Sequence, residues 1–357
     1  MKNKNSKGLF DEAIRLEKLT NQGDQLVMLK QTINWEQFRP ILDSVLIKEA
    51  KGPGGREAFD YIMMFKILIL QRYYNLSDDQ MEYQILDRMT FMRFLDLELS
   101  DKVPDSKTIW LFKERLTKAN VVEKLFEKFH DELEKQGYIG NEGKIIDASF
   151  VEVPRQRNSR EENKTIKEGN IPQDWKDKPH KLSQKDIDAK WTKKNDETFY
   201  GYKDHVKTDK KSKFIDKFKV TDASVHDSQP LDDLLEEKDE DQSLHADSAY
   251  TGEEQEKTIK DKKMHNCVNE KGYRNKPLTE EQKAKNKEKS KVRARVEHVF
   301  GFIENSMHSS FIRTIGIARA TATIGLMNLT YNMFRLIQLQ KAGYMGEVCH
   351  VVKNIKR

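Results

Sequence analysis

The sequence predicts an α+β protein in which an all-helical N-terminal block precedes a region built around a mixed sheet. From Trp35 to Gly137 the apolar residues recur at helical spacing. At Lys144 the pattern changes to short runs rich in Ile, Val and Phe, which are typical of strands. After that point we expect three paired strands, a helix, a strand, a helix, a strand and a last helix. This order indicates a sheet with both antiparallel and parallel neighbours.

The helical block is expected to begin after a polar segment, residues 1–30, in which 10–29 could form a weak helix. The first long helix, over 55–75, has the apolar content of a buried one. Ser77 and Gln80 form a capping box that starts the next helix. Asp105 can cap a third.

A further capping box, Asn120 with Glu123, predicts the start of the helix that ends near Gly137.

Five strands are expected after Lys144, over residues 144–153, 198–208, 214–223, 244–246 and 264–268. Residues 210–212 are expected to form a hairpin turn between the second and the third strand. Four helices complete the prediction: 231–237, 253–262, 292–307 and 312–339. The last should pack on the sheet through its leucines and Phe334. Residues 155–197 and 271–291 are almost entirely polar, so the first is expected to be a flexible insert and the second a basic connector.

Charge is distributed unevenly over the 357 residues, although the formal net charge is only +5. Basic residues outnumber acidic ones in 155–194 and 271–295, whereas 227–241 is strongly acidic. Basic stretches around acidic residues suit a polyanionic substrate beside a metal site. The alternative is that each run is a solvated loop or helix face.

The remaining composition indicates a cytoplasmic, soluble protein. Two cysteines, Cys267 and Cys349, form neither a disulfide framework nor a pair with metal-ligand spacing. The N-terminus lacks the apolar core of a signal peptide, and the longest apolar run, 61–70, contains Lys66 and is too short to span a bilayer.

Three acidic residues carry the strongest chemical signal. Asp147 lies in the apolar run Ile-Ile-Asp-Ala-Ser-Phe-Val, and Asp247 follows another strand in His-Ala-Asp-Ser-Ala-Tyr-Thr-Gly. A carboxylate in such a strand loses hydration and needs a cation or a hydrogen-bonded partner to stay charged. Mg²⁺ prefers hard oxygen ligands, and two aspartates with Glu297 suit a two-metal phosphodiester site.

Helical geometry predicts how Glu297 is placed. At about 100° per residue, Glu297 lies at the border of the apolar face formed by Val296, Val299 and Phe300. Arg293 lies four residues earlier on the same side, so it can pair with Glu297 or hold a phosphate.

These stretches resemble the DDE transposases of bacterial insertion sequences, in the superfamily that groups insertion sequences four and five, with an InsH-like N-terminal domain. The resemblance runs from about Ile33 to Leu339. The matching pieces are Pro-Asp-Ser-Lys-Thr-Ile-Trp-Leu-Phe-Lys-Glu-Arg-Leu at 104–116, Ile-Ile-Asp-Ala-Ser at 145–149, Tyr-Gly-Tyr-Lys-Asp-His at 200–205, Val-His-Asp-Ser-Gln at 225–229 and Ala-Asp-Ser-Ala-Tyr-Thr-Gly at 246–252.

The family's signature around the glutamate reads Tyr, two residues, Arg, three residues, Glu, six residues, Lys. Arg293 and Glu297 fit it, whereas Ser290 replaces the tyrosine and Glu304 the lysine. The expected metal ligands are therefore present. The replacements at Ser290 and Glu304 affect how flanking nucleotides would be bound.

The resemblance implies a helical DNA-binding domain over 31–137 and an RNase H-like catalytic domain over 140–340 with the insert 155–197, followed by a basic tail, 341–357. It implies a transposase that binds the inverted terminal repeats of its element and catalyses magnesium-dependent cleavage and strand transfer. The partners would be double-stranded DNA of the element ends and the target, and a second copy of the chain on DNA. The protein would be associated with the nucleoid.

In this reading Asp147, Asp247 and Glu297 hold two Mg²⁺ ions, for which Mn²⁺ can substitute, and Arg293 assists them. Four basic residues are expected at the DNA backbone: Lys203, Lys289, Lys291 and Arg295. The insert 155–197 would be flexible or become ordered on DNA.

Two other classes of function stay open, a DNA-binding protein without catalysis and a nuclease that cleaves without rejoining. For His205 and His226 the alternatives are proton transfer near the metal site or a structural role. Trp175 and Trp191 could stack on exposed bases or pack on the domain.

Overall fold

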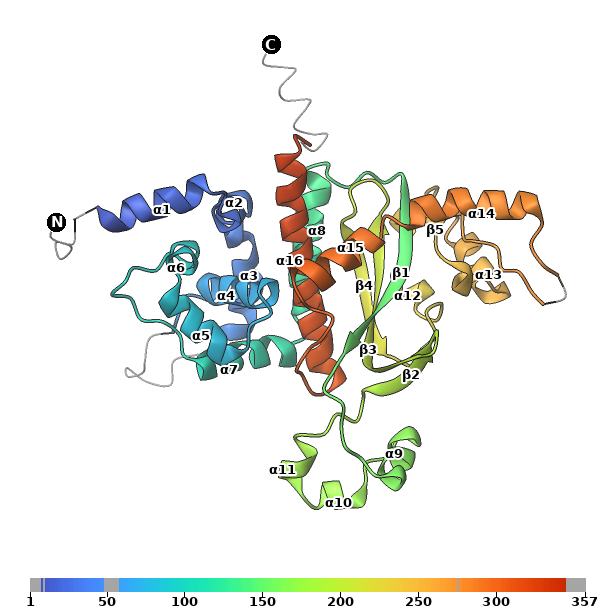
Figure 1. Ribbon diagram of the computed structural model, residues 1–357, viewed down its shortest axis with the longest axis horizontal. Coiled ribbons are helices and arrows are strands. Elements are labelled where there is room, and N and C mark those ends of the chain that lie inside the picture. Colours follow the sequence, from blue (N-terminus) through green and yellow to red (C-terminus); the bar gives the residue numbers. More distant parts are fainter. Residues whose placement is uncertain (1–7, 9, 48–57, 275, 345–357) are drawn as a thin grey trace, which may run out of the picture.

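The computed structural model describes residues 8, 10–47, 58–274 and 276–344. A helical block and a sheet lie on opposite sides of one long helix, α16 (Ile317–Lys341) (Figure 1). The α+β prediction is therefore confirmed. Parts of the N-terminal segment and of the C-terminal tail, together with Cys349, lie outside the described residues.

Helices make up the N-terminal block throughout, as expected. The elements are α1 (Asp11–Asn21), α2 (Gln25–Thr32), η1 (Trp35–Phe38), α3 (Arg39–Leu46), α4 (Tyr61–Tyr73), α5 (Asp78–Asp87), α6 (Met89–Leu95), α7 (Ser106–Lys118) and α8 (Val122–Lys135). The capping box of Ser77 and Gln80 is present at the start of α5. Asp105 caps α7 by accepting from the Thr108 N–H at 2.7 Å.

The predicted capping box at Asn120 is wrong. Asn120 has a left-handed φ of 51° and belongs to the end of α7. Its N–H donates to Thr117 O at 3.0 Å and the Val121 N–H donates to Leu116 O at 3.3 Å. These bonds form a helix-terminating motif that favours asparagine after glycine. The next helix, α8, consequently begins without a side-chain cap.

Within the described residues the sheet has six strands in the order β2-β3-β1-β5-β6, with β4 also paired to β3. The strands are β1 (Gly143–Glu152), β2 (Lys190–Lys194), β3 (Glu197–Asp209), β4 (Ile215–Asp222), β5 (Ser243–His245) and β6 (His265–Asn266). β1 to β4 are joined by antiparallel pairing, whereas β1, β5 and β6 run parallel. The mixed sheet is confirmed, and β2 is an additional strand from the charged insert.

The insert itself is folded, which corrects the expectation of a flexible segment. It contains α9 (Arg160–Lys167), α10 (Gln173–Lys176) and α11 (Pro179–Leu182) before β2. Trp175 is fully buried among them, and its Nε1–H donates to Glu162 Oε1 at 2.6 Å. One tryptophan therefore provides the core that the sparse apolar residues alone could not. Base stacking by Trp175 is excluded because the ring is covered.

The elements after β4 are α12 (Leu231–Leu234), η2 (Glu237–Asp239), η3 (Ser248–Tyr250), α13 (Glu253–Asp261), α14 (Glu280–Arg293), α15 (Glu297–Gly301) and η4 (Phe302–Ser306). The predicted helix over 292–307 is in fact divided, and the supposed connector before it is helix α14. A capping box of Thr279 and Gln282 starts α14. Bonds of the i to i−3 type from Arg295 to Glu297 then reset the helical phase, so that Val296 and Val299 face the core.

Helix α16 packs on both halves of the molecule. It contacts α4 and α8 of the helical block and β4 of the sheet. Phe334 stacks on Tyr73 with ring centroids 3.7 Å apart, and Asn332 exchanges hydrogen bonds with the Ile215 backbone at 2.9 and 2.8 Å. One hydrophobic core consequently runs from Leu26 to Leu339. The predicted packing of this helix on the sheet is confirmed, although Phe334, which was expected to contribute to it, stacks on Tyr73 of the helical block.

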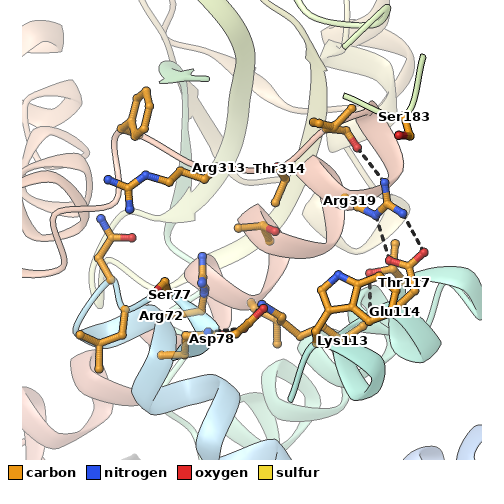
Figure 2. A pocket seen from close by; sticks show the side chains of 18 residues that line it. Arg72, Ser77, Asp78, Lys113, Glu114, Thr117, Ser183, Arg313, Thr314 and Arg319 are labelled. Atoms are coloured by element: carbon orange, nitrogen blue, oxygen red, sulfur yellow. Dashed lines mark hydrogen bonds and ion pairs between the residues drawn. The ribbon is translucent and has the colours of Figure 1, made fainter. Parts of the chain in front are cut away.

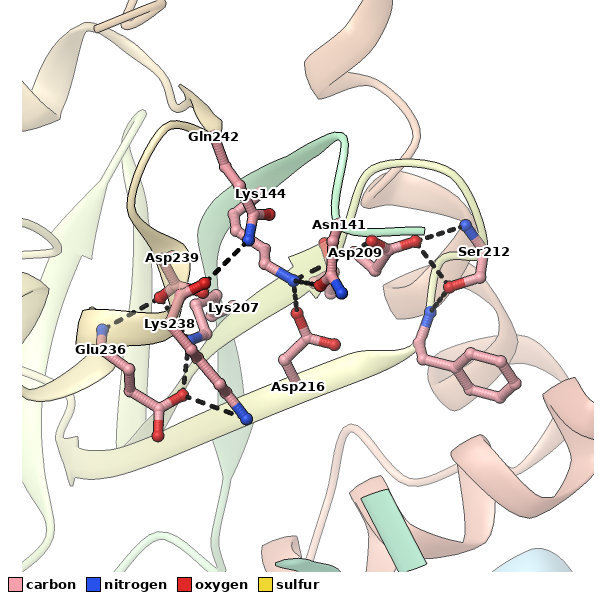
Figure 3. A network of polar contacts seen from close by, with 12 residues as sticks. Asn141, Lys144, Lys207, Asp209, Ser212, Asp216, Glu236, Lys238, Asp239 and Gln242 are labelled. Atoms are coloured by element: carbon pink, nitrogen blue, oxygen red, sulfur yellow. Dashed lines mark hydrogen bonds and ion pairs between the residues drawn. The ribbon is translucent and has the colours of Figure 1, made fainter. Parts of the chain in front are cut away.

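A smaller core covers the part of the sheet around β5 and contains Ile146, Leu244 and Tyr250. Beside it, buried lysines and carboxylates form an ionic network (Figure 3). Lys207 Nζ lies 2.7 Å from Asp239 Oδ2 and 2.7 Å from Glu236 Oε2, and Lys144 Nζ lies 2.7 Å from Asp216 Oδ2.

Burial alone would raise the pKa of Asp216, but the charge of Lys144 and a hydrogen bond with His130 hold it well below its usual range. No helix in the described part of the chain is long and apolar enough to cross a bilayer.

Candidate active site

Asp147 lies in the middle of β1, opposite Val206 of β3, with 15% of its side chain exposed. Its Oδ1 accepts from the Ala148 N–H at 2.9 Å. Burial raises the pKa of Asp147, and the negative charge of Asp247 raises it further, while the Ala148 N–H and the charge of Arg293 act in the opposite direction. The carboxylate therefore lies where a cation stabilises its charged form.

Asp247 reaches the same level of the sheet through the neighbouring parallel strand. Ile145 of β1 pairs with His245 of β5, so both aspartates lie two residues beyond that pair. Adjacent strands are about 4.8 Å apart. The Oδ1 of Asp247 accepts from the Ala249 N–H at 2.8 Å, which caps η3 and fixes the carboxylate at the strand end.

Arg293 connects Asp147 with Glu297. Its Nη1 lies 2.9 Å from Asp147 Oδ2 and its Nη2 lies 3.3 Å from Glu297 Oε1. The predicted i to i+4 pair is therefore formed, and Arg293 also reaches the strand. Glu297 begins α15 and is 62% exposed, so it lies at the rim of the contact between helix and sheet.

The chemistry of these donors fits divalent ions, because all three offer carboxylate oxygens and a nearby cation stabilises the charge of the partly buried Asp147. Their arrangement is open, with a guanidinium bridging Asp147 and Glu297. Among the described residues, the group whose ligand atoms already lie within 4.8 Å of one another is a different one on α8, namely His130, Asp131 and Glu134. Two of that group's members are exposed acids, and His130 is engaged by Asp216 at 3.1 Å.

Tyr250 lies beside the aspartates and was not singled out from the sequence. It is buried, and its hydroxyl has no hydrogen-bond partner among the described residues. Burial raises the pKa of Tyr250 well above its usual value, and the charges of Asp147, Asp227 and Asp247 add to the effect. The sequence feature that points to Tyr250 is its place in the Ala-Asp-Ser-Ala-Tyr-Thr-Gly motif, three residues after Asp247.

Asp227, from the Val-His-Asp-Ser-Gln motif, is the partner of Lys203. The Lys203 Nζ lies 2.7 Å from Asp227 Oδ1 and donates to Val225 O at 2.6 Å. Lys203 is 7% exposed, so its ammonium is held inside the fold and not presented to DNA. The structure thus gives Lys203 a different role from the expected backbone contact.

The other expected DNA contacts lie on α14 and just after it. Lys289 donates to Val268 O at 2.8 Å, and Arg295 donates to Lys210 O at 2.8 Å. Lys291 is exposed and pairs with Glu288 at 2.6 Å. Lys289 and Arg295 therefore connect α14 and the residues after it to neighbouring loops. Burial lowers the pKa of His245 to about 4, and the positive charges of Lys210, Lys289 and Arg295 lower it further.

The histidines near the motifs have structural partners. His205 is fully buried, with Nε2 2.8 Å from Thr221 Oγ1, and burial lowers its pKa to about 4. His226 Nδ1 lies 2.9 Å from Ser228 Oγ and accepts from the Ser228 N–H at 3.3 Å. These contacts support the structural alternative for His226, in the turn before α12.

Two sequence models match the chain. Residues 140–333 match the family described as "Transposase DDE domain", and residues 14–115 match "Transposase domain (DUF772)". Among solved structures, the chain resembles the cryo-EM structure of the piggyBac transposase synaptic complex with hairpin DNA, with a TM-score of 0.44 and 13% identity over 88% of this chain and 76% of that chain. That likeness is remote.

The matched regions define a DNA-cleaving and strand-transferring enzyme of a family that uses divalent metal ions. More particularly, the chain belongs to the DDE transposases, with the pair of domains typical of bacterial insertion-sequence transposases of the insertion sequence four and five type.

Proposed function

We propose that this transposase binds the inverted terminal repeats of an insertion sequence, and that Asp147, Asp247 and Glu297 form the centre that cuts and rejoins phosphodiester bonds. The observation that supports this most directly is the Arg293 bridge, which joins Glu297 of α15 to Asp147 of β1, although Arg293 and Asp147 are 146 positions apart in the sequence. Asp247 is placed beside Asp147 by the parallel register of β1 and β5.

The three carboxylates would hold two Mg²⁺ ions, for which Mn²⁺ can substitute. When bound, these ions would activate the attacking water or DNA 3′ hydroxyl and stabilise the leaving oxygen. Asp147 would supply an oxygen from a fixed strand, whereas the exposed Glu297 can adjust from the first turn of α15. No covalent intermediate with the protein is needed.

Arg293 would position the site in two ways. Its guanidinium neutralises Asp147 and Glu297 and keeps the two carboxylates from repelling each other. Once cations bind these carboxylates, Arg293 becomes available for a phosphate oxygen, to which a guanidinium can donate two hydrogen bonds. The same residue would therefore support the empty and the DNA-bound site.

Around this centre, the exposed part of α14, including Lys291, would hold the DNA backbone together with the basic insert. The helical block before Gly137 would read the terminal repeat, because helices fit the major groove. Joining two ends to a target requires two copies of the chain on DNA, which would act as a homodimer on the DNA of the nucleoid.

Incubation of the full-length protein with labelled element ends, target DNA and Mg²⁺ tests this function. Products separated on a denaturing gel should include both cut ends and strands joined to the target. Cutting without joining would favour a nuclease, and binding without cutting would favour a non-catalytic DNA-binding protein. Either result would contradict the proposal.

A further inference from the structure

A cavity of about 510 Å³ with several charged side chains in its walls lies between the helical block and the segment that precedes α16 (Figure 2). Its walls come from the end of α4, from α5 and α7, from residues 311–315 and from the first turns of α16. Its size is within the usual range of ligand pockets. None of the candidate catalytic residues lines it.

Four cationic side chains line this cavity, and two of them have no carboxylate in hydrogen-bond contact. Lys113 pairs with Asp78, and Arg319 makes a two-pronged ion pair with Glu114 at 2.9 and 2.9 Å. The guanidinium groups of Arg72 and Arg313 make no hydrogen bond or ion pair with any described residue; Arg313 lies 5.8 Å from the Phe311 ring centroid. The cavity therefore contains two guanidinium groups that have no ion-pair partner among the described residues.

Arg72 is held in an environment that favours an anionic ligand. Burial lowers the pKa of the Arg72 guanidinium to about 10, with the charge of Asp78 acting in the opposite direction, so the side chain stays charged at neutral pH. A desolvated charge without a partner is unfavourable until an anion binds it. Gln71, which is fully buried in the same wall, leaves its Oε1 without a hydrogen-bond partner and can accept from a ligand donor.

An aromatic surface lies next to these groups. Trp110 is 50% exposed although it lines the cavity, and Phe311 is 38% exposed on the opposite segment. Exposed rings beside guanidinium groups are the combination that holds a nucleotide, with the base against a ring and the phosphate against arginine. The ligand class that fits is a phosphate group attached to a base.

The cavity is connected to the candidate active site through β1. Glu152, at the end of β1, donates from its N–H to Ser310 O at 2.8 Å and accepts from the Ile312 N–H at 2.9 Å. Asp147 and Glu152 are five residues apart on this strand, which corresponds to about 17 Å. One DNA strand rises about 3.4 Å per nucleotide, so a single strand could reach both places.

We propose that this cavity is a DNA subsite that binds a backbone phosphate and its nucleotide roughly five or more positions from the cleaved bond. This inference rests on the proposed function, since it assumes that the cut strand lies at Asp147. Arg72 and Arg313 bind the phosphate, Gln71 accepts from the base or sugar, and Trp110 stacks on the base. The subsite fixes the position of the DNA relative to the catalytic carboxylates.

The test uses full-length protein and fluorescence anisotropy with labelled element-end duplexes in EDTA, so that no cutting occurs. Arg72→Gln/Arg313→Gln should weaken binding at least about tenfold and reduce the salt slope by about one. The control Lys257→Gln/Lys260→Gln removes two exposed charges of α13, outside the cavity and outside the helical block, and should change binding much less. Arg313→Gln alone, at an exposed position, keeps the test valid if the double variant melts at a lower temperature.

Duplexes with one neutral methylphosphonate at successive positions then locate the contact. A methylphosphonate roughly five to eight nucleotides from the cut should weaken wild-type binding and leave the double variant unaffected. The subsite is overturned if both double variants lose equal affinity, or if no position shows this difference.

Binding of free deoxyadenosine monophosphate, followed by Trp110 fluorescence with Trp110→Phe as the reference, separates DNA from a free nucleotide. Tight binding of the mononucleotide with unchanged DNA affinity in the double variant would overturn the DNA subsite. If the wild-type protein cuts its element ends while the double variant binds them normally, only the subsite is wrong. If the wild type neither binds nor cuts them, the proposed function fails and the subsite with it.

Discussion

At the scale of single residues, the guanidinium of Arg293 lies between two carboxylates that come from different elements, Asp147 of β1 and Glu297 of α15. Such a bridge holds a site together before a metal ion arrives. Loss of a carboxylate should therefore abolish cleavage, whereas loss of the arginine should slow cleavage and change its Mg²⁺ dependence.

Replacing the carboxylates by their amides tests the proposed ligands. Asp147→Asn, Asp247→Asn and Glu297→Gln should each reduce cleavage to background, because a neutral amide is a poor ligand for Mg²⁺. Binding to element ends should remain nearly unchanged. Gel assays of cutting and anisotropy measurements of binding check this, and near wild-type cutting by any variant would remove that residue from the ligand set.

Arg293→Ala should slow cleavage by about 10- to 100-fold, the range found when groups that orient metal ligands are lost. Arg293→Lys keeps the charge but not the two-pronged geometry and should recover only part of the rate. The metal dependence of the rate distinguishes the roles, because a positioning residue alters the Mg²⁺ concentration needed for half-maximal cleavage. An unaltered rate and Mg²⁺ dependence in Arg293→Ala would show that the bridge has no function.

Asp204 gives a prediction about pH. It is 1% exposed, and burial raises its pKa to about 7, although Asn328 donates to it at 3.1 Å. The folded state therefore keeps a proton on Asp204 that the unfolded state releases near pH 4. Between about pH 4 and 7 the free energy of unfolding consequently falls as pH rises. The slope is at most about 1.4 kcal/mol per pH unit.

Asp204→Asn removes that slope while it keeps the shape of the side chain. The difference in Tm between variant and wild type should therefore grow in favour of the variant from pH 4 to 7 and stay constant above. Comparing the difference is necessary because the buried His205, with a pKa lowered to about 4, acts in the opposite direction. A difference that does not depend on pH would mean that Asp204 is not protonated in the folded protein.

Residue patterns predicted that Asp147 lies within a strand and that Asp247 follows another, because a lone acid in an apolar run is conspicuous. They could not predict the partners of Lys203, since its ion pair with Asp227 joins a strand to a loop 24 positions later. They also passed over Tyr250, whose surroundings are set by long-range packing and not by its neighbours in sequence.

At the scale of elements, the sequence predicted helices and strands where local signals were strong, as at the capping box of Ser77. It failed where a local signal had two readings. Asn120 resembles an N-cap but ends α7 in a left-handed conformation. The polar residues of α14 carry no apolar stripe, so only the Thr279 capping box marked that helix.

The ionic network around β3 is an element-scale feature with a measurable role. Lys207→Met should lower the free energy of unfolding by about 3–5 kcal/mol, because Asp239 is left buried and uncompensated. Adding Asp239→Asn should recover part of the loss. The exposed pair of Lys193 and Asp196 is the control, and Lys193→Met should change stability by less than about 1 kcal/mol. Urea unfolding measures each value, and equal effects at both lysines would contradict this account.

At the scale of the whole molecule, α16 belongs to the core of the helical block as much as to the sheet. A fragment of residues 1–140 should therefore fold poorly, because Tyr73 and its neighbours lose the surface of Phe334. Circular dichroism and dye binding would show reduced helicity and exposed apolar surface. Cooperative unfolding of the fragment at a wild-type Tm would show that the block is independent of α16.

Because α16 packs on both the helical block and the sheet, it also limits how the DNA specificity of such a transposase can evolve. Proteins whose recognition and cutting parts have separate cores can acquire a new specificity by exchanging one part for another. Here an exchanged block would have to match the side chains of α16 that already fit β4, including Asn332 against Ile215. Transposases with this shared helix would therefore change their DNA specificity by successive substitutions on the outer faces of the helices. The terminal repeats of their insertion sequences would diverge gradually together with the protein.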